Sequence, residues 1–295
     1  MKRQGGVALV LVLAVTGVLA LLALQIALTA KSQVRQAQAL SDRAEAELKL
    51  HSEEAALIFS LLTNEPNADP RRYNTAEPNN PYAKAWNFRG ELFEVNGGSF
   101  LLQDVGGLFP MPLPTDPPEP FADLLVALGF DSSRAMSVSR SLSLSAPAEQ
   151  GIPLQSFKEL VLIGSLTRDE IDRLEAVASL SPGANRNPNT APPAVISATY
   201  SEVVLEPLLS ARRMFTLDSS SIQEITGRTL DESAMTSLIG PYFRIDVTVE
   251  RRGSRLRRQS IWAVRPQSIS EPLRLFSYRD LNPEPRKLLT GIKND

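Results

Sequence analysis

The sequence predicts an α+β protein in which a long N-terminal helix packs on a small antiparallel sheet, and an all-helical domain is inserted between the parts of that sheet. The first observation behind this prediction is an uncharged N-terminal run that continues into a segment of helical periodicity. The second is a set of strand patterns at both ends of the remaining chain. The third is a block of helix patterns between these strands, which begins after six prolines in residues 110–120.

The uncharged run covers 24 residues, from Val7 to Ala30. A helix of that length spans about 36 Å, enough to cross a hydrocarbon core of about 30 Å with some tilt. Lys2 and Arg3 precede it, so the positive-inside rule keeps the N-terminus cytoplasmic and places the rest of the chain outside the cytoplasm. A cleaved secretory signal is the alternative, but its apolar region is shorter, and no compact cleavage site interrupts this run before Lys31.

Residues 31–63 continue the helix as an amphipathic segment without Pro or Gly. Apolar or small residues recur there in steps of three or four, and His51 bridges the one longer step. We expect this stripe to pack on the globular part, and the helix to end before Asn64 and Pro66. His51 is interpreted as a packed or half-exposed helix residue, since no Ser or Asp arrangement near it supports a catalytic base. The stripe consists of Val34, Ala37, Leu40, Ala44, Leu48, Ala55, Phe59 and Leu62.

Strand patterns lie in residues 64–109 and 241–295. Residues 91–95 and 99–103 flank Asn96-Gly97-Gly98, which predicts a hairpin because Asn and Gly accept positive φ. Residues 242–250 alternate between apolar and polar side chains, and further strands are predicted at 259–265 and 273–279. In the alternating strand, the side chains expected to point inward are Phe243, Ile245, Val247 and Val249, and those expected outward are Arg244, Asp246, Thr248 and Glu250.

Residues 110–240 read as helices. Ser156 with Glu159, and Thr167 with Glu170, have the spacing of capping boxes, in which the first side chain accepts from an early helix amide and the Glu accepts from the cap amide. The carboxylate pair Asp169-Glu170 is therefore interpreted as first-turn residues favoured by the helix dipole. Other helices are predicted at 121–130, after Thr190 at Pro192-Pro193, at 201–213 and at 231–238.

Composition excludes several classes of protein. The chain has 31 basic and 33 acidic residues, a net charge of 31 − 33 = −2, which argues against a bulk nucleic-acid binder. Cysteine is absent, so thiol nucleophiles, disulfides and thiolate metal sites are excluded together. The single histidine excludes a His-cluster metal centre. We expect no enzymatic activity.

Five short segments occur in a characteristic order and spacing: GVALVL (6–11), DVGGL (104–108), LQSFKEL (154–160), NPNTAPPAV (187–195) and YFRI (242–245). Together they resemble the minor pseudopilin K family of type II secretion, the general secretion pathway protein K family. The resemblance extends over nearly the whole chain, and it implies a type IV pilin-like fold. It also implies a structural subunit at the pseudopilus tip, with the I and J minor pseudopilins as partners, that starts assembly and supports export of folded proteins. The implied location is the inner membrane, single-pass, with a periplasmic C-terminal domain.

The resemblance assigns roles to three residues near the N-terminus. A prepilin peptidase would cut between Gly6 and Val7 and the new N-terminus would be methylated, which makes residues 1–6 a leader, 7–30 the transmembrane helix and 31–63 its continuation. Gly suits the junction because a side chain would obstruct the protease backbone; the alternative is that Gly5-Gly6 is merely a flexible start. Leu11 stands where most pilin subunits carry Glu, and the K family likewise lacks this Glu. Without that carboxylate a neighbour's buried amine lacks a partner, which favours the filament tip.

The chain departs from the family in one segment. Residues 131–145 are Ser-rich and lack the Asp-Trp-Ile-Asp-like stretch that members often carry, which leaves open a related or specialised secretion system. Calcium sites are known in the family, but no ligands match here, so no metal residue and no cofactor are assigned.

Two other classes of function stay open from the residues alone. One is a membrane-anchored periplasmic hydrolase that uses carboxylates. The other is a membrane-tethered DNA-uptake receptor, since residues 187–213 could form a helix-hairpin-helix. Against it, the hairpin at 197–201 has no Gly, and residues 158–232 carry 7 basic and 11 acidic side chains, a net of 7 − 11 = −4. Five arginines in residues 251–258 could contact lipid headgroups or an acidic partner, but their position between two strands favours a solvated hairpin turn.

Overall fold

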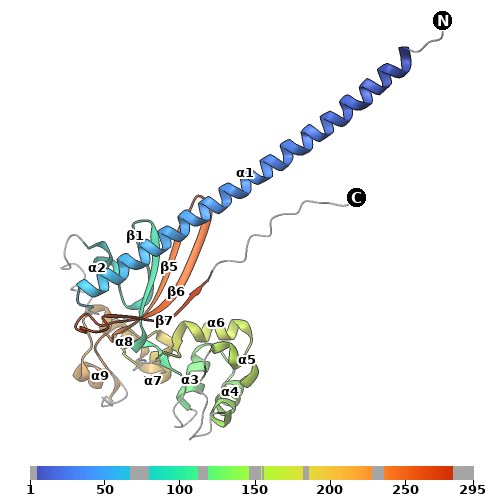
Figure 1. Cartoon of the computed structure of the whole chain (residues 1–295). Helices are drawn as coiled ribbons and strands as arrows, with labels where there is room; N and C mark the ends of the chain where they lie inside the picture. Colours follow the sequence, from blue (N-terminus) through green and yellow to red (C-terminus); the bar gives the residue numbers. More distant parts are fainter. Residues whose placement is uncertain are drawn as a thin grey trace.

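The long helix α1 (Gly5–Thr63) dominates the molecule in the computed structural model. Its first half projects away from every other element, and its second half lies across a sheet (Figure 1). It ends where the Asn64 amide donates to the Ser60 carbonyl and Pro66 follows. The prediction of one helix through the uncharged run and its continuation is confirmed. The structure describes residues 5–66, 80–111, 119–145, 154, 156–181, 186–227 and 236–281.

The sheet under α1 has five antiparallel strands in the order β1-β2-β5-β6-β7. Strand β2 pairs with β5 along its whole length, so the two ends of the sequence after α1 meet in the middle of the sheet. The α+β fold and the hairpin at Asn96-Gly97 are confirmed, with positive φ at both turn residues. The strands are β1 (Arg89–Val95), β2 (Gly98–Asp104), β5 (Tyr242–Arg251), β6 (Ser254–Val264) and β7 (Leu273–Asp280).

One hydrophobic core joins α1 to the sheet. Side chains at alternate positions of β2 and β5 pack against the helix, as period-2 alternation requires. Phe100 of β2 stacks on Phe93 of β1 and meets the edge of Tyr82, which lies on the short helix α2 (Pro81–Ala85). The largest fully buried members of this core are Leu50, Leu57, Leu61, Phe88, Phe100, Leu102 and Phe243.

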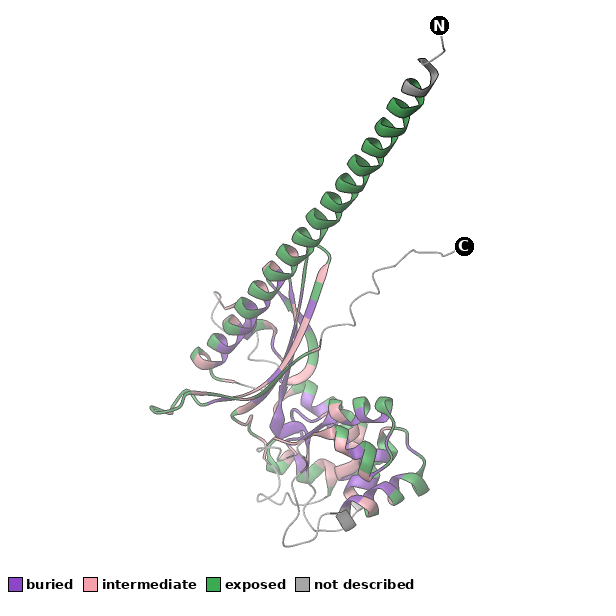
Figure 2. Ribbon diagram, turned by 45° about the vertical axis from the view of Figure 1, so that its right-hand side comes forward, coloured by how far each residue is buried: buried purple, intermediate pink, exposed green. Residues whose placement is uncertain are grey.

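The predicted packing face of α1 is wrong. The stripe predicted to cover the sheet points outward from Val34 to Phe59, and Figure 2 shows the outer side of this helix as exposed. Its last member, Leu62, is partly buried against the core, as predicted. The helix carries small and apolar residues on two faces, and periodicity alone cannot say which face meets the sheet. The true packing face includes two charged residues, Glu53 and Glu54, so it does not form an unbroken apolar stripe in the sequence. Both are buried, and they accept hydrogen bonds from Tyr82 and Ser260. The apolar residues that cover the sheet are Ala46, Leu50, Leu57, Ile58 and Leu61.

The helical segments form a second cluster below the sheet, on the side away from α1 (Figure 1). Both capping boxes are present as predicted. A two-residue parallel pair, β3 (Phe109–Pro110) with β4 (Ala178–Ser179), ties the start of this block to its middle. The helices are α3 (Glu119–Ala127), α4 (Ser132–Ser145), α5 (Leu160–Ile163), α6 (Arg168–Val177), α7 (Pro193–Tyr200), α8 (Glu202–Met214) and α9 (Ser219–Thr226), with 3-10 turns at Val105–Gly107 and Phe157–Glu159.

Local differences from the prediction have physical causes. Helix α4 is Ser-rich and was not predicted, because Ser lowers helix propensity and only tertiary packing of Ala135, Val138 and Leu142 holds it. Of the helix predicted at 231–238, residues 231–235 lie outside the described residues and 236–238 are not helical. Asp246, predicted outward, is buried and accepts from Arg257 at 3.1 Å.

Candidate interaction surface

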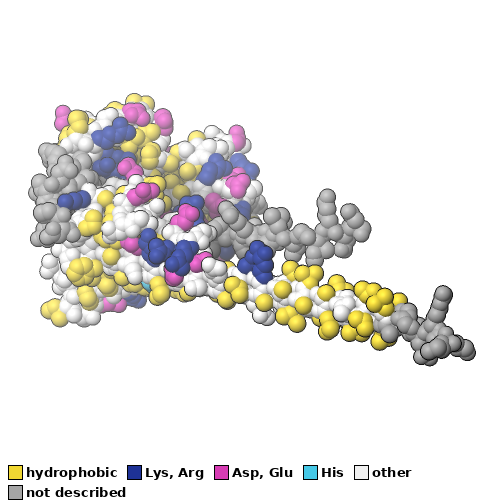
Figure 3. All heavy atoms as spheres, turned by 90° about the horizontal axis from the view of Figure 1, so that it is seen from above, with side chains coloured by type: hydrophobic (Ala, Val, Ile, Leu, Met, Phe, Trp, Pro, Cys, Tyr) yellow, Lys and Arg dark blue, Asp and Glu magenta, His cyan; other side chains and the backbone are white. Residues whose placement is uncertain are grey.

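The first half of α1 exposes its apolar side chains on all sides. Among the residues that the structure describes, one helix, within Leu9–Thr63, is long and apolar enough to cross a membrane, with a mean hydropathy of 2.7 in its most apolar stretch. Figure 3 shows hydrophobic side chains along the projecting helix. The hydroxyls of Thr16 and Thr29 donate to the helix's own carbonyls, Val12 and Gln25, which is how such groups are satisfied in lipid. This half requires an apolar environment that the rest of the chain does not supply.

The residues singled out in the leader region all lie on this helix. Gly6 and Val7 belong to its first turn. Leu11 is exposed, like its neighbours along the uncharged run. The first half of α1, to which all three belong, projects away from the sheet and the helical block (Figure 1). Processing and filament position at these residues stay predictions.

Beyond the uncharged run, the exposed stripe continues down the helix; we call it the outer seam. Its apolar members occupy about a third of the helix circumference, as an amphipathic contact face does. The exposed fractions are 64% at Val34, 70% at Leu40 and Leu48, and 65% at Phe59. The outer seam consists of Val34, Ala37, Leu40, Ala44, Leu48, His51, Ala55 and Phe59.

The arginine cluster at 251–258 is a hairpin turn, as predicted, and four of its five arginines form ion pairs within the chain. Arg252 at the turn reaches Glu45 of α1 at 3.0 Å, and Arg257 reaches Asp246 at 3.1 Å. Arg258 lies between Glu54 at 3.8 Å and Asp280 at 2.8 Å. The exposed pairs contribute little to stability, since surface ion pairs are worth about 0–1 kcal/mol. The pairs of Arg252 with Glu45 and of Arg258 with Glu54 link the β5–β6 hairpin to α1.

A cavity of about 350 Å³ opens beside the outer seam; we call it the seam pocket. It lies between α1 and strands β6 and β7. His51 lines it, exposed, with its ring nitrogens 3.3 and 3.5 Å from the Arg258 guanidinium. His51 is therefore a surface helix residue facing a cation rather than a base facing a nucleophile.

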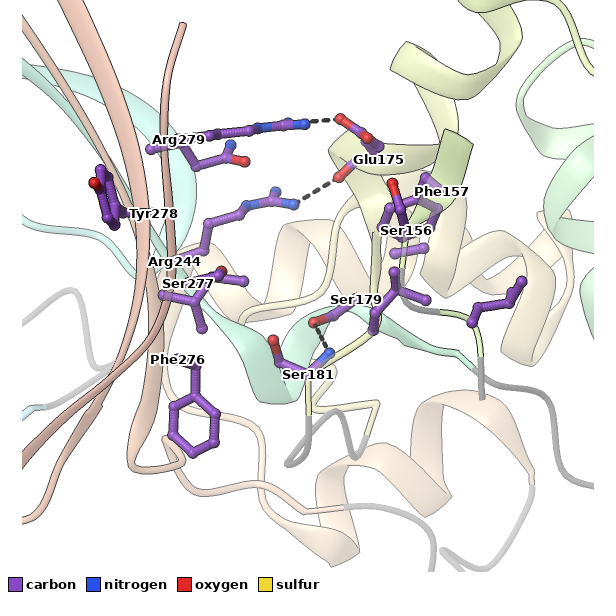
Figure 4. Close-up of a pocket in the computed structure, with 15 residues that line it drawn as sticks. Ser156, Phe157, Glu175, Ser179, Ser181, Arg244, Phe276, Ser277, Tyr278 and Arg279 are labelled. Carbon is purple, nitrogen blue, oxygen red and sulfur yellow. Dashed lines mark hydrogen bonds and ion pairs between the residues drawn. The ribbon is translucent and has the colours of Figure 1, made fainter. Parts of the chain in front are cut away.

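A larger cleft of about 480 Å³ separates the sheet from the helical block (Figure 4). Arg244 of β5 donates to the carbonyl oxygens of Glu175 and Ala176 at 2.6 and 2.7 Å, at the negative C-terminal end of α6. Arg279 of β7 donates to the Glu175 carboxylate at 2.6 Å. Burial lowers the pKa of Arg244. Through these contacts the charged groups of the cleft connect the sheet to the helical block. The hydroxyl-bearing and aromatic side chains that line the rest of the cleft are neutral.

A buried polar junction joins the sheet to the helical block on the other side of this cleft. Asp104, at the end of β2, accepts from the Thr190 hydroxyl at 2.8 Å, the Asn187 amide at 3.2 Å and the Gly106 amide at 2.9 Å. Burial raises the pKa of Asp104 to about 6. A Cβ on Gly107 would lie 2.6 Å from the Thr190 backbone, so only Gly permits this approach. The DVGGL and NPNTAPPAV segments thus meet here, 83 residues apart in sequence at Asp104 and Asn187.

Further groups extend the junction. The Asn189 side chain accepts from the Leu217 amide at 2.7 Å and donates to the Leu217 carbonyl at 2.9 Å. The buried Arg212 guanidinium donates to the Ala191 carbonyl at 2.6 Å. In the segment considered as a helix-hairpin-helix, the side-chain amides of Asn187 and Asn189 and the Arg212 guanidinium therefore form hydrogen bonds within the fold. Its α7–α8 turn is made by Ser201, at φ 99°. No group of three or more His, Asp or Glu side chains that could hold a metal ion occurs in the described part of the chain.

Comparisons with known proteins show a distant likeness in fold. No protein-family model matches the chain, and no curated protein matches it. The chain is similar in structure to one chain of the crystal structure of the GspK-GspI-GspJ complex from the type 2 secretion system of enterotoxigenic Escherichia coli. The two are 15% identical with a TM-score of 0.46, and the match covers 86% of this chain and 99% of that chain. A likeness this distant carries no argument about function.

Proposed function

We propose that the chain is a minor pseudopilin of a type II protein secretion system. In this role it is anchored in the inner membrane by α1, with its N-terminus cytoplasmic and its folded part periplasmic. It joins the I and J minor pseudopilins at the pseudopilus tip, where it starts assembly and supports export of folded proteins. One observation carries the proposal: a single helix serves as an apolar span in its first half and as part of a folded core in its second, while its outer seam stays uncovered.

The outer seam supports an assembly role over a simple anchor. A signal-anchor needs only the uncharged run, and nothing about anchoring calls for apolar side chains on the outer side of residues 34–59. Apolar area removed from water contributes about 25 cal/mol per Å², so partners that cover the seam gain stability from it. Packing of similar helices side by side covers the span and the seam with one kind of contact.

The residues near the N-terminus support the same role. A prepilin peptidase would release Val7 as the new N-terminus by cutting after Gly6. Leu11 gives a neighbouring subunit's amine no carboxylate partner, and the helical block adds bulk below the sheet (Figure 1). Both features oppose repetition of this subunit along a filament and favour one end.

The alternatives have less support. Among the carboxylates that the structure describes, Asp104 has a markedly raised pKa, which is typical of a catalytic acid, but it is fully buried and cannot meet a substrate. The charged groups of the inter-layer cleft pair with each other or with backbone carbonyls. The net negative charge of residues 158–232 opposes binding of DNA phosphates.

Processing at Gly6 tests the proposal. We expect coexpression with a prepilin peptidase to remove residues 1–6 and leave Val7 as the N-terminus, as measured by intact mass and N-terminal sequencing. Gly6→Leu should block the cut, while the matched variant Gly5→Leu should still be processed. An intact leader on the unaltered chain, or a cut near Ala30, would contradict the pseudopilin assignment.

A further inference from the structure

We infer that the seam pocket is a docking site for an aliphatic or aromatic side chain from a helix of another membrane-anchored subunit that lies along the outer seam. The inference rests on the proposed function and names the contact point through which it operates. The pocket is built from two sources. Helix α1 contributes His51, Glu54, Ala55 and Ile58, and strands β6 and β7 contribute Arg258, Trp262, Leu275 and Tyr278.

The size and walls of the pocket suit an apolar side chain. Its volume of about 350 Å³ lies at the lower end of the range of ligand pockets, large enough for one bulky side chain and its backbone. Ala55 and Ile58 form the helix side, and Trp262 lies opposite them on β6. Leu275 and Tyr278, on the edge strand β7, are 42% and 63% exposed. These two side chains stand at the rim with apolar surface still open to water.

The charges in the pocket disfavour an ionic ligand. Arg258 is balanced by Glu54 and Asp280, and its guanidinium lies 5.7 Å from the centre of the Tyr278 ring. Glu54 also accepts from the Ser260 hydroxyl and the Trp262 indole. A carboxylate entering here would lose its water and meet an arginine that is already paired with two carboxylates. A neutral apolar group loses nothing and gains contact with Trp262.

Continuity with the membrane span identifies the source of that side chain. Leu48, His51, Ala55 and Phe59 recur on one face with the spacing of a helix-packing seam, and His51 and Ala55 belong both to this face and to the pocket. The same face continues upward into the exposed uncharged run. A helix that covers the seam therefore also runs into the span, so its owner is anchored in the same membrane. The pocket supplies a hole on one flank of α1 for a knob of that helix.

Filling the pocket tests the inference in the full-length processed chain, coexpressed with the I and J minor pseudopilins and purified in detergent. Leu275→Trp fills the pocket from the sheet and Ala55→Trp fills it from the helix. Leu92→Trp is the matched control, because Leu92 is an exposed leucine, 66% accessible, on the opposite edge strand β1. We expect both pocket variants to weaken copurification at least tenfold, and the control to match the unaltered chain. Thermal unfolding checks that all variants stay folded.

Crosslinking gives a readout that does not depend on affinity. A photoactivatable phenylalanine analogue at Tyr278 should form an adduct with a partner, and the same group at Leu92 should not. Equal copurification of Leu275→Trp and Leu92→Trp, with no partner adduct at Tyr278, overturns the inference while leaving the proposed function standing. An adduct at Tyr278 between two copies of this chain also overturns it. Failure of the unaltered chain to bind either partner overturns the proposed function and the pocket's occupant together.

Discussion

Leu48 and Leu50 lie two residues apart on α1 and have opposite environments. Leu48 is 70% exposed and Leu50 is 2% exposed. The residues that share a face with Leu50 are packed against Phe100, Phe243 and their neighbours in the sheet, whereas those that share a face with Leu48 form the outer seam. The comparison teaches that this helix has two apolar faces with different purposes, and that hydrophobicity alone does not distinguish a core face from an assembly face.

Polar residues separate the two faces better than apolar ones do. The buried face contains Glu53 and Glu54, each held by a specific partner on α2 or β6. Tyr82, which donates to Glu53, has its pKa raised to about 12 by burial and by this bond. The outer seam carries no comparable set of long-range bonds among its apolar members. A core face of this kind is specified by its polar contacts, while the seam is free to accept a different partner.

Truncating one residue from each face should give the largest difference. Leu57→Ala removes a fully buried side chain and should lower the free energy of unfolding by about 2–5 kcal/mol. Phe59→Ala removes an exposed ring and should change it by no more than about 0.5 kcal/mol. Chemical denaturation of the two purified variants measures both values.

The same pair should show the reverse order in assembly. Phe59→Ala should weaken copurification with the other minor pseudopilins, since it removes apolar surface from the outer seam. Leu57→Ala should leave copurification unchanged under conditions in which it stays folded. Equal destabilisation by the two substitutions would mean that α1 does not use distinct faces for folding and assembly.

Sequence reasoning succeeded where the signal is local. The hairpin at Asn96-Gly97 and the capping boxes at Ser156 and Thr167 each depend on residues at most a few positions apart, and all three are present. The prediction of which face of α1 packs on the sheet was wrong, because that choice depends on strands that lie far along the chain. The seam pocket needs His51 next to Arg258, 207 residues away, and no local pattern indicates that contact.

The contact between the DVGGL and NPNTAPPAV segments at the polar junction could not be predicted from local sequence, although both segments are recognisable as motifs. Asp104 and Thr190 are 86 residues apart, and their hydrogen bond depends on how the helical block folds back on β2. The one available signal was the pair of glycines after Asp104, since Gly107 permits the approach of the Thr190 backbone. Unlike the cleft, where arginines meet carbonyls, the junction buries a carboxyl group among neutral donors.

This difference predicts a pH dependence that arises at the junction. The pKa of Asp104 is about 6 in the folded chain, above the 3.8 of a free carboxyl, so the folded state binds this proton more tightly. Its contribution to stability is complete below about pH 4 and is lost as pH rises through 6, by an amount on the order of 3 kcal/mol. Asp104→Asn keeps the group neutral and should remove this loss, as measured by denaturation between pH 4 and 7.

An exposed carboxylate gives the control. The pKa of Asp218 is lowered to about 2 by hydrogen bonds from Ser221 and Ser220, so it titrates below this window. Asp218→Asn should therefore change stability by the same amount at every pH between 4 and 7. A parallel pH profile for the unaltered chain and Asp104→Asn would show that Asp104 does not hold its proton in the folded state.

The smallest expected effect concerns Leu11, in the first half of α1. Leu11→Glu would supply the carboxylate that a neighbour's N-terminal amine lacks, and this pairing compensates a charge that is costly in low dielectric. The helical block remains below the sheet, however, and its bulk still opposes repetition (Figure 1). We therefore expect neither the processed chain nor the Leu11→Glu variant to form filaments alone, as seen by electron microscopy of purified protein. Extended filaments of the unaltered chain with its helical block attached would favour a major-subunit role, and filaments of the variant alone would assign the tip position to Leu11 rather than to the block.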